Sequence, residues 1–519
     1  MDTQRKSVTA VDNGMVVALR AHLQAMTGQP VELLETHISW ILLSGSLAYK
    51  LKKPVRLPFL DFTELESRQR YCELELRLNQ RLAPSLYLDV VPICGTVDSP
   101  RIDGIGEPID YAVCMRRFAA RALLSEQLAD GHLHEAQVEQ LTRRLADFHH
   151  DAPAAELGSQ FGSPERISSA VANVIDQLDA VATASRMQAW RNWLKEQVRV
   201  LHPVWQSRRA TGAVRECHGD LHLANAVQVG EEVLAFDCIE FDPELRWIDV
   251  ISDLSFLTMD LQAHGRADLA FVALDAYLQR SGEYAGLQVL RFYEIYRALV
   301  RALVTSLQAR NHIEGNVPGA PDYQGCAARM MPGSRGGPRL MITRGLSGSG
   351  KSTVARRLLA QVGAVRVRSD VERKRLFGLG ALQRSADHDL DLYTPEATRR
   401  TFERLATCAR DGLRAGYPVI VDAAFLRRGE RQAFRALAAE LRVPFSILDC
   451  GASPDVLQQR LAARAAAGND PSEADVSVLK RQVHWQEALD AHEQSRALEV
   501  ATDQPVDYVA LGERWLAAT

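Results

Sequence analysis

The sequence predicts a two-lobed α+β domain followed by an α/β domain with a parallel sheet and helices on both faces. A glycine-rich stretch at 345–352 stands between a short apolar run and a helical segment, as at the edge of a parallel sheet. Residues 1–312 instead combine hairpin patterns with long helical segments. Glycine and proline crowd into 313–337, where apolar periodicity is weak. We therefore predict domains at 1–312 and 338–519, joined by a linker at 313–337.

The overall composition is that of a globular protein with more than one hydrophobic core. The chain has 519 residues, of which 46% are hydrophobic and 24% charged. The net charge of −4 predicts no general affinity for nucleic acid or for anionic membranes. The eight cysteines form no C-x-x-C pair, which favours reduced thiols and a cytoplasmic location. We see no signal peptide and no apolar run of about eighteen residues, so no membrane span is expected.

A hairpin is predicted near the start of the first domain, with strands at 38–43 and 47–52. The second strand contains Leu47-Ala48-Tyr49-Lys50, which resembles the lysine-bearing strand of protein kinases. Strand alternation places Ala48 and Lys50 on one face, where the alanine could pack on a base and the lysine could meet phosphate. Lys52 and Lys53 are close rivals for the same role, and a solvated lysine is the plain alternative.

A helix is predicted over 63–82, and a kinase needs a carboxylate there to hold its lysine. Glu75 is our first choice, because it shares a face with Tyr71 and Leu78. Glu73 is the second choice. An exposed helix charge is the alternative for either residue.

The stretch from His218 to Asn225 repeats the Asp-x-x-x-x-Asn spacing of a kinase catalytic loop. Asp220 would accept the proton of the attacking hydroxyl, and Asn225 would offer a neutral oxygen to Mg²⁺. A predicted hairpin follows and ends at Asp237, where kinases keep a second metal ligand. The alternative is a capped loop with structural aspartates.

Three further aspartates follow this hairpin: Asp242, Asp249 and Asp253. One of them is expected to brace the catalytic loop, and we prefer Asp249, which follows Arg246. The others are expected to cap helices.

The glycine-rich stretch of the second domain matches the phosphate-binding P-loop, G-x-x-x-x-G-K-[ST]. Its glycines let backbone N–H groups converge on phosphate oxygens, and the following helix adds its positive N-terminus. Lys351 would reach the outer phosphates and Ser352 would hold Mg²⁺. The residues expected to bind the nucleotide are Gly345, Ser347, Gly348, Ser349, Gly350, Lys351, Ser352 and Thr353.

Two acids are expected at the carboxyl ends of strands in this domain, where open α/β sheets bind ligands. Asp370 follows the predicted strand 364–368 and would act as the base for an acceptor hydroxyl. Arg373, one turn later, would hold an anionic group of that acceptor. Asp422 ends the strand 417–421 and would order the Mg²⁺ shell. A helix cap at Asp370 and a solvated Arg373 are the alternative.

Arg460 and Arg464 are predicted to share one face of a helix over 454–467. They could close over the transferring phosphates as a lid. The alternative is a solvated helix that happens to be rich in arginine.

Residues 1 to ~325 resemble the aminoglycoside phosphotransferase family, which is related to protein kinases, through Lys50, Asp220, Asn225 and Asp237. The resemblance implies a protein-kinase-like fold in which ATP binds between a small sheet-bearing lobe and a helical lobe. The region after Asp253 lacks the acidic cluster with which true aminoglycoside kinases hold a polycation, so the acceptor stays open.

The remaining residues resemble small P-loop kinases such as gluconate kinase and the kinase domain of polynucleotide kinase. The match covers the P-loop, Asp370 with Arg373, and the lid segment from Arg464 to Asp475. The whole chain resembles a bacterial family described as bifunctional aminoglycoside phosphotransferase/ATP-binding proteins.

This resemblance implies two ATP sites and does not establish a substrate. From the motifs we expect ATP and Mg²⁺ at both sites and phosphoryl transfer to hydroxyl groups of small molecules. The C-terminal acceptor is expected to be anionic: a sugar acid, a nucleotide or a nucleic-acid end. Nucleic acid enters only as such a substrate, and no membrane partner is expected. The competing interpretation is a regulatory ATP-binding protein in which one or both sites control conformation. Intact Asp220 and Asp370 favour the enzyme. Neither acceptor nor the oligomeric state follows from the sequence.

Overall fold

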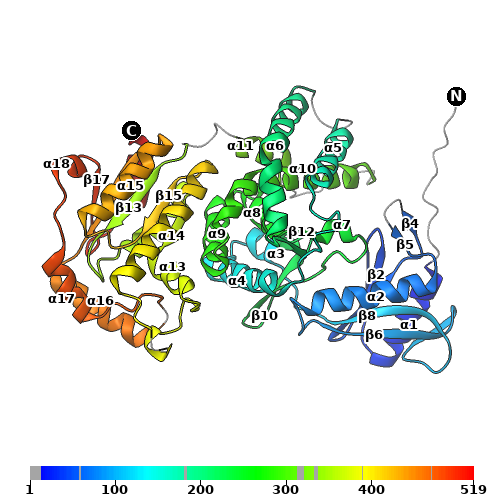
Figure 1. The fold of residues 1–519 in the computed structure, drawn as a ribbon. Helices are drawn as coiled ribbons and strands as arrows, with labels where there is room; N and C mark the ends of the chain where they lie inside the picture. The colour runs from blue at the N-terminus through cyan, green and yellow to red at the C-terminus, as the bar shows by residue number, and fades with distance from the viewer. Residues whose placement is uncertain are drawn as a thin grey trace. The chain divides into compact units, whose positions relative to one another are not determined.

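The computed structural model describes residues 13–57, 60–179, 184–311, 321–331, 337–388, 390–468 and 470–518. The chain divides into two compact units. The first comprises 1–162 and 212–253, and the second 163–211 and 254–519. The predicted boundary at residue 312 is a different division, and it stays a prediction. The second unit therefore contains both the later helices of the predicted first domain and the whole P-loop region (Figure 1).

An antiparallel six-stranded sheet, in the order β1-β2-β3-β8-β6-β7, forms the N-terminal part of the first unit. Its strands are β1 (Glu32–Glu35), β2 (Ser39–Ser44), β3 (Leu47–Lys52), β6 (Tyr87–Thr96), β7 (Ser99–Ile102) and β8 (Pro108–Arg116). A separate two-stranded ribbon joins β4 (Arg56–Leu57) to β5 (Leu60–Asp61). The predicted hairpin is β2–β3, and Lys50 pairs in register with Ile41 on one side and Val113 on the other.

Two helices pack against this sheet. Helix α1 (Gly14–Thr27) buries Val16, Leu19 and Leu23 in a cluster with Trp40 and Leu42 of β2. Helix α2 (Leu65–Gln80) packs on β6 and β8. The α2 face that meets the sheet carries Glu75, which is fully buried, so the carboxylate must find a cationic partner in the interior.

The rest of the first unit holds the predicted catalytic loop between short strands. Its strands are β9 (Val214–Glu216), β10 (Ala226–Val229), β11 (Glu232–Ala235) and β12 (Trp247–Asp249). Its helices are α3 (Leu124–Ala129), α4 (Glu135–Asp151), the 3₁₀ turn η1 (Leu223–Asn225) and α7 (Pro243–Arg246). The hairpin β10–β11 follows Asn225 directly and delivers the chain to Asp237.

The second unit opens with a group of helices, joined by α8 (Val250–Ala263), which begins in the first unit. The others are α5 (Pro164–Leu178), α6 (Ala184–Ala210), α9 (Ala267–Ser281), η2 (Tyr284–Gly286), α10 (Leu287–Asn311) and α11 (Tyr323–Met330). Helix α11 lies inside the stretch predicted as a linker and buries Tyr323 and Met330. The linker interpretation is therefore wrong for residues 323–330, while 312–320 and 332–336 lie outside the described residues.

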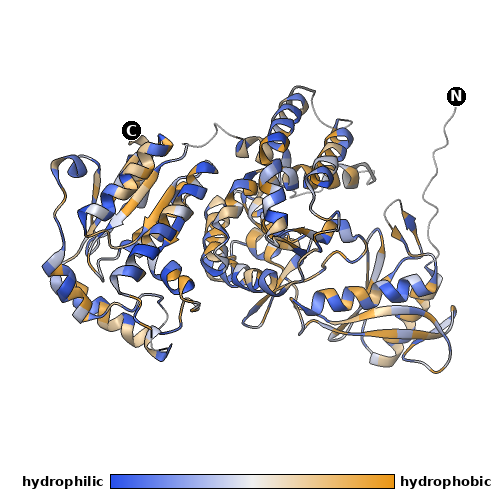
Figure 2. Cartoon of the chain, in the orientation of Figure 1, coloured by the Kyte–Doolittle hydropathy of each residue, from blue (hydrophilic) through white to orange (hydrophobic). Residues whose placement is uncertain are grey.

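A parallel five-stranded sheet, in the order β14-β15-β13-β16-β17, forms the P-loop region. The strands are β13 (Leu340–Arg344), β14 (Val365–Arg368), β15 (Val419–Asp422), β16 (Phe445–Gly451) and β17 (Ala497–Ala501). Figure 2 shows hydrophobic colour along β13 and β15, as expected for strands covered on both faces.

Helices α12 (Lys351–Val362) and α19 (Tyr508–Ala517) pack together beside this sheet, and α14 (Pro395–Arg414) packs with α15 (Arg428–Leu441). The remaining helices are α13 (Ser369–Leu376), η3 (Ser385–His388), α16 (Pro454–Ala467), α17 (Val476–Trp485) and α18 (Ala491–Gln494). The chain leaves β13 toward β14 and later returns past β13 to β16. Right-handed crossovers in opposite directions put helices on opposite faces. The predicted succession of an α+β and an α/β fold is thus confirmed.

Candidate active sites

The first candidate site is built around Lys50 of β3. Its Nζ lies 2.8 Å from Oε1 of Glu75 and 2.6 Å from Oδ1 of Asp237. The hairpin, helix α2 and the chain after β11 thus converge on one ammonium group. Burial opposes the positive charge of Lys50, but Asp237 and Glu75 outweigh burial and raise its pKa well above the usual value. The same ammonium outweighs burial at Asp237 and lowers the pKa of that carboxyl.

Lys52, a rival in the sequence, joins the same network from its other end. Its Nζ contacts Oε2 of Glu75 and Oε1 of Glu240. Burial opposes the charge of Lys52, but Glu240 and Glu75 raise its pKa to about 12. Lys52 is fully buried, whereas the Asp237 carboxylate is 44% exposed. Lys50 therefore sits between a buried anchor, Glu75, and an accessible acid, as a phosphate-binding lysine requires. Lys53 instead contacts Glu35.

Hydrogen bonds to Asp253 hold the loop that carries Asp220. Asp253 accepts hydrogen bonds from the backbone N–H of His218 at 3.0 Å and of Gly219 at 2.8 Å. Its carboxylate also lies 3.0 Å from Nε2 of His149. Burial alone would raise the pKa of Asp253, but its contact with His149 lowers it. The prediction that Asp249 braces this loop is therefore wrong, because Asp249 accepts from Ile251 in its own turn.

Asp220 and Asn225 lie together on this loop. Nδ2 of Asn225 donates to the backbone carbonyl of Asp220 at 3.0 Å, so the amide oxygen of Asn225 points away from that carbonyl. The Asp220 side chain is partly exposed and lies 3.5 Å from Nε2 of His222. Nε2 of His218 contacts the carbonyl of Phe236 at 2.8 Å, which ties the loop to the segment that carries Asp237.

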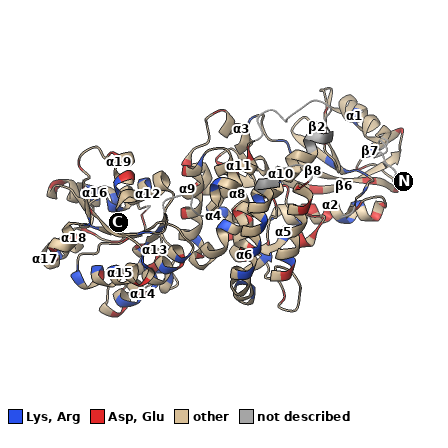
Figure 3. Cartoon of the chain, turned by 90° about the horizontal axis from the view of Figure 1, so that it is seen from above, with Lys and Arg blue, Asp and Glu red and all other residues tan. Residues whose placement is uncertain are grey.

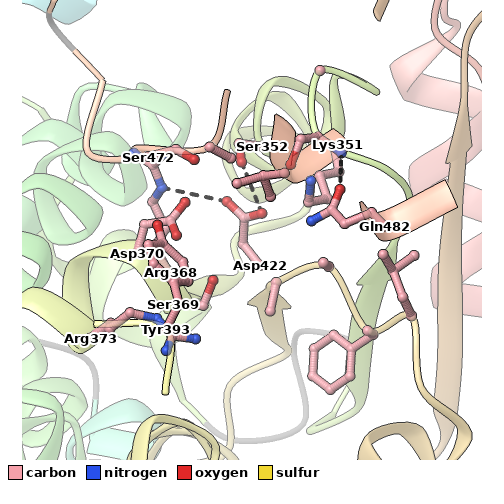
Figure 4. Close-up of a pocket in the computed structure, with 18 of the residues that line it drawn as sticks. Lys351, Ser352, Arg368, Ser369, Asp370, Arg373, Tyr393, Asp422, Ser472 and Gln482 are labelled. Carbon is pink, nitrogen blue, oxygen red and sulfur yellow. Dashed lines mark hydrogen bonds and ion pairs between the residues drawn. The ribbon is translucent and has the colours of Figure 1, made fainter. Parts of the chain in front are cut away.

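The second candidate site lies at the carboxyl ends of β13, β14 and β15, where a cavity of about 760 Å³ opens (Figure 4). Lys351, Ser352 and Thr353 line it from the start of α12, and Ser347, Gly348 and Gly350 line it from the loop. Gly345 and Ser349 do not line the cavity. Gly345 has φ of +147°, and a Cβ there would lie 2.4 Å from the carbonyl of Cys450, so only glycine fits.

The Ser352–Asp422 pair fits a magnesium ion. Oγ of Ser352 lies 3.0 Å from Oδ1 of Asp422. Oδ2 of Asp422 is buried and has no hydrogen-bond partner among the described residues. A hydroxyl and a carboxylate beside a P-loop are hard oxygen donors of the kind that Mg²⁺ prefers. Such an ion would join nucleotide phosphates and reduce their negative charge.

No carboxylate of the described residues lies within ion-pair distance of Lys351. Its Nζ donates to the carbonyl of Leu346 at 3.3 Å. Burial lowers its pKa more than the nearby Asp422 and Asp370 raise it. A group of phosphates would supply the missing counter-charge.

Asp370 opens α13 and lines the cavity with Ser369 and Arg368. No hydrogen bond or ion pair to its carboxylate exists among the described residues, and the residue that caps α13 is Arg368. Asp370 is thus not held as a helix cap. Its position at the cavity wall is compatible with a base for an acceptor hydroxyl.

Arg373 also lines the cavity, but it is buried rather than extended into it. It donates to the carbonyl of Leu392 at 2.6 Å and lies over the ring of Tyr393, 5.1 Å from its centroid. Its Nε is buried without a hydrogen-bond partner among the described residues. The unpartnered Nε of this guanidinium is therefore buried within the cavity wall.

The two predicted lid arginines both line the cavity from α16. Arg460 donates to the carbonyl of Thr502 at 2.7 Å and to the carbonyl of Gly348 at 3.3 Å, so it rests on the P-loop itself. Arg464 donates to the carbonyl of Ala474 in the segment that follows α16. These contacts leave both guanidinium groups at the cavity rim.

Two further residues contact this site, of which the sequence suggested only Arg368, as part of a positive surface near Asp370. Gln482 of α17 accepts the backbone N–H of Ser347 at 2.8 Å, and Nε of Arg368 lies 3.5 Å from Oδ2 of Asp422. Alternation along β14 carried a signal for Arg368, because a basic residue at the end of a buried strand meets the site. Gln482 had none, since its helix is remote from the P-loop in sequence.

Comparison with known proteins identifies the relatives of the whole chain. The uncharacterized protein Rv2004c of Mycobacterium tuberculosis strain H37Rv is 30% identical over 472 residues, which cover 89% of this chain and 92% of the relative. The uncharacterized protein Mb2027c of Mycobacterium bovis matches to the same extent. The chain belongs to the family of these mycobacterial proteins. A family model described as an AAA domain matches residues 340–489 of this family member, which span its P-loop region.

Two solved structures are similar to portions of this family member. A choline/ethanolamine kinase family protein from Mesorhizobium loti is 17% identical and covers 62% of this chain and 96% of its own, with a TM-score of 0.38. A gluconokinase from Sinorhizobium meliloti 1021 is 21% identical and covers 35% of this chain and 90% of its own, with a TM-score of 0.26.

The remaining predictions concern cysteines and membranes. All eight cysteines lie in the described residues, and each is a buried thiol without a disulfide bond. No described helix combines the length and the apolar character that crossing a bilayer needs.

Proposed function

We propose that this protein is an ATP-dependent phosphotransferase with two nucleotide sites, each of which transfers the γ-phosphoryl group to a hydroxyl group. The observation that carries the proposal is the cavity of the second candidate site, which is lined by Lys351, the Ser352–Asp422 pair and Asp370. Phosphate binding, metal binding and a base are the elements that phosphoryl transfer needs. The match to an AAA domain over 340–489 supports nucleotide binding there.

The first site supports the same reaction with a different set of residues. Lys50 is held between Glu75 and Asp237, and Asp220 and Asn225 stand on one braced loop. In this proposal Asp220 accepts the acceptor's proton, and Asn225 and Asp237 hold Mg²⁺. The two sites together support a bifunctional kinase of the kind that the resemblance to aminoglycoside phosphotransferase/ATP-binding proteins implies.

The acceptor of the second site is proposed to carry an anionic group, as a sugar acid, a nucleotide or a nucleic-acid end does. The unused Nε of Arg373 and the cavity-lining Arg427 and Arg481 support this choice. Figure 3 shows Lys and Arg positions gathered over α13 and α14, beside this cavity. An anion would balance the positive charge of the Arg373 guanidinium, which burial otherwise disfavours.

The experiment is a phosphorylation screen of a metabolite pool with the full chain, ATP and Mg²⁺, read by mass spectrometry and by ADP formation. Lys351→Ala is expected to lower turnover of one class of products by about 10²- to 10³-fold, because it removes the charge nearest the phosphates. Asp220→Asn is expected to abolish formation of the other class of products without changing the affinity for ATP. The controls are Lys195→Ala and Asp98→Asn, exposed residues of α6 and of the β6–β7 turn that line neither site.

The proposal is contradicted at either site if the corresponding variant keeps full activity. Nucleotide binding without any acceptor-dependent ADP formation would favour a regulatory ATP-binding protein instead.

A further inference from the structure

Helix α9 reaches the P-loop region through one buried ion pair. Asp275 of α9 accepts from Arg366 of β14, with Nη2 at 2.7 Å from Oδ2 and Nε at 3.2 Å from Oδ1. Asp275 is 8% exposed and Arg366 is 3% exposed. Two parallel hydrogen bonds between a planar guanidinium and a carboxylate fix both groups in orientation as well as in distance.

The third nitrogen of the same guanidinium reaches the candidate magnesium residues. Nη1 of Arg366 donates to the carbonyl of Ser352 at 3.2 Å and lies 3.7 Å from Oδ2 of Asp422. Ser352 and Asp422 are the residues proposed to hold Mg²⁺. One side of Arg366 is thus bound to α9, and the other side faces the nucleotide site.

Arg366 and a metal ion compete for the same oxygen. Within the described part of the chain, Oδ2 of Asp422 has no hydrogen bond and lies 3.5 Å from Arg368 and 3.7 Å from Arg366. Charges interact strongly in a buried site, so a guanidinium that closed on Asp422 would neutralise the carboxylate. Asp275 balances the charge of Arg366 and holds two of its nitrogens away from Asp422.

Helix α9 is itself fixed against the P-loop region by further contacts. The ring of Phe271 lies where a Cβ on Gly363, at the end of α12, would be only 2.8 Å away. Tyr284, just after α9, donates its hydroxyl to the carbonyl of Arg366 at 3.2 Å. Nη2 of Arg404 donates to the carbonyl of Gly282 at 3.1 Å. Asp275 therefore has a fixed position relative to β14.

We infer that Asp275 is a positioning residue for the P-loop site: it holds Arg366 off Asp422 and so keeps that carboxylate available to Mg²⁺. The inference rests on the proposed function of this site. It makes α9, a helix within the predicted domain 1–312, a component of the second nucleotide site.

The test measures how the binding of a fluorescent ATP analogue to the full chain depends on Mg²⁺ concentration. Binding that is lost on Lys351→Ala defines the signal of the P-loop site. In Asp275→Asn, the Mg²⁺ concentration for half-maximal binding is expected to rise about 10- to 100-fold, as for other residues that orient metal ligands indirectly. Binding of the analogue without metal should stay unchanged.

Two further variants separate positioning from packing. Phe271→Leu weakens the packing of α9 against α12 without altering Arg366. It should leave the Mg²⁺ dependence of analogue binding unchanged. Asp275→Leu combined with Arg366→Met replaces the buried pair by apolar side chains, which proteins often tolerate. This double variant should return the half-saturating Mg²⁺ concentration to within about threefold of the original value, because the competing cation is gone.

The inference is overturned if Asp275→Asn leaves the Mg²⁺ dependence unchanged, or if the double variant loses about tenfold or more. The double variant alone decides the matter should Asp275→Asn not fold. If Lys351→Ala removes no nucleotide binding from the unaltered chain, the proposed function of the site has failed instead.

Discussion

At the scale of the residue, the two candidate sites treat their lysines in opposite ways. Lys50 has two carboxylate partners, which raise its pKa well above the usual value. Among the residues that the structure describes, Lys351 has only a carbonyl within hydrogen-bond distance, and burial lowers its pKa. Lys351 therefore depends on a bound anion for its charge balance, whereas Lys50 is balanced before any nucleotide arrives.

This difference predicts a pH dependence for the second site. Bound phosphates stabilise the protonated form of Lys351, so binding raises a pKa that burial has lowered. Nucleotide affinity should be full below the lowered pKa and should fall as pH rises through it, before the ordinary value of 10.5 is reached. The measurement is the affinity of an ATP analogue for the Asp237→Asn variant between neutral and alkaline pH. A flat profile up to that ordinary value would argue against a buried phosphate-binding lysine.

Several residue-level choices could be predicted from the sequence, and others could not. The motif spacing singled out Lys50, Asp220 and Asp237, and the structure brings the first and the last of them within 2.6 Å. The brace at Asp253 was missed because three aspartates follow the hairpin at similar spacing, and only the path of α8 decides between them. Arg373 was expected to reach toward an acceptor, but Tyr393 and Leu392 hold it in the wall.

At the scale of the element, the backbone path of the predicted catalytic loop requires glycine at position 219. Gly219 has φ of +93°, and a Cβ there would lie 2.8 Å from the carbonyl of Leu245. Its N–H is one of the two that Asp253 accepts. The tight turn brings the backbone within hydrogen-bond distance of Asp253, and Asp220 follows as the next residue.

Gly219→Ala is expected to destabilise the first unit by about 1–3 kcal/mol, because alanine is strained at this φ and meets a carbonyl. Activity at the first site should fall as well, since Asp220 moves with the loop. Gly230→Ala is the matched control: its φ is +60°, but open space surrounds the added methyl group. Denaturant unfolding and product formation are the two measurements. Equal effects of the two substitutions would mean that the close approach to Leu245 is unimportant.

Element boundaries illustrate where local patterns suffice. Strands β13 and β15 are apolar runs that end in polar residues, so their ends and the site at their ends follow from sequence. Helix α11 does not, because glycine and proline around it resemble a linker. Its burial of Tyr323, whose hydroxyl donates to Asp260 of α8 at 2.8 Å, is a long-range contact that no local pattern shows.

At the scale of the whole molecule, the helices of the predicted first domain and the P-loop region are not separate. The second compact unit contains both, and Asp275, Phe271 and Tyr284 all contact the P-loop region. A linker at 313–337 implied independence of the two parts. The buried ion pair instead gives them a shared element beside the second nucleotide site.

The central claim, that one chain carries two nucleotide sites, is tested most directly by the stoichiometry of ATP–Mg²⁺ binding to the full chain in calorimetry. The account predicts two nucleotides per chain in the unaltered protein. It predicts one in Lys351→Ala and one in Asp237→Asn, since each substitution affects a separate site, and no measurable binding when both are combined. A single nucleotide per unaltered chain, or a stoichiometry of two that survives both substitutions, would contradict it.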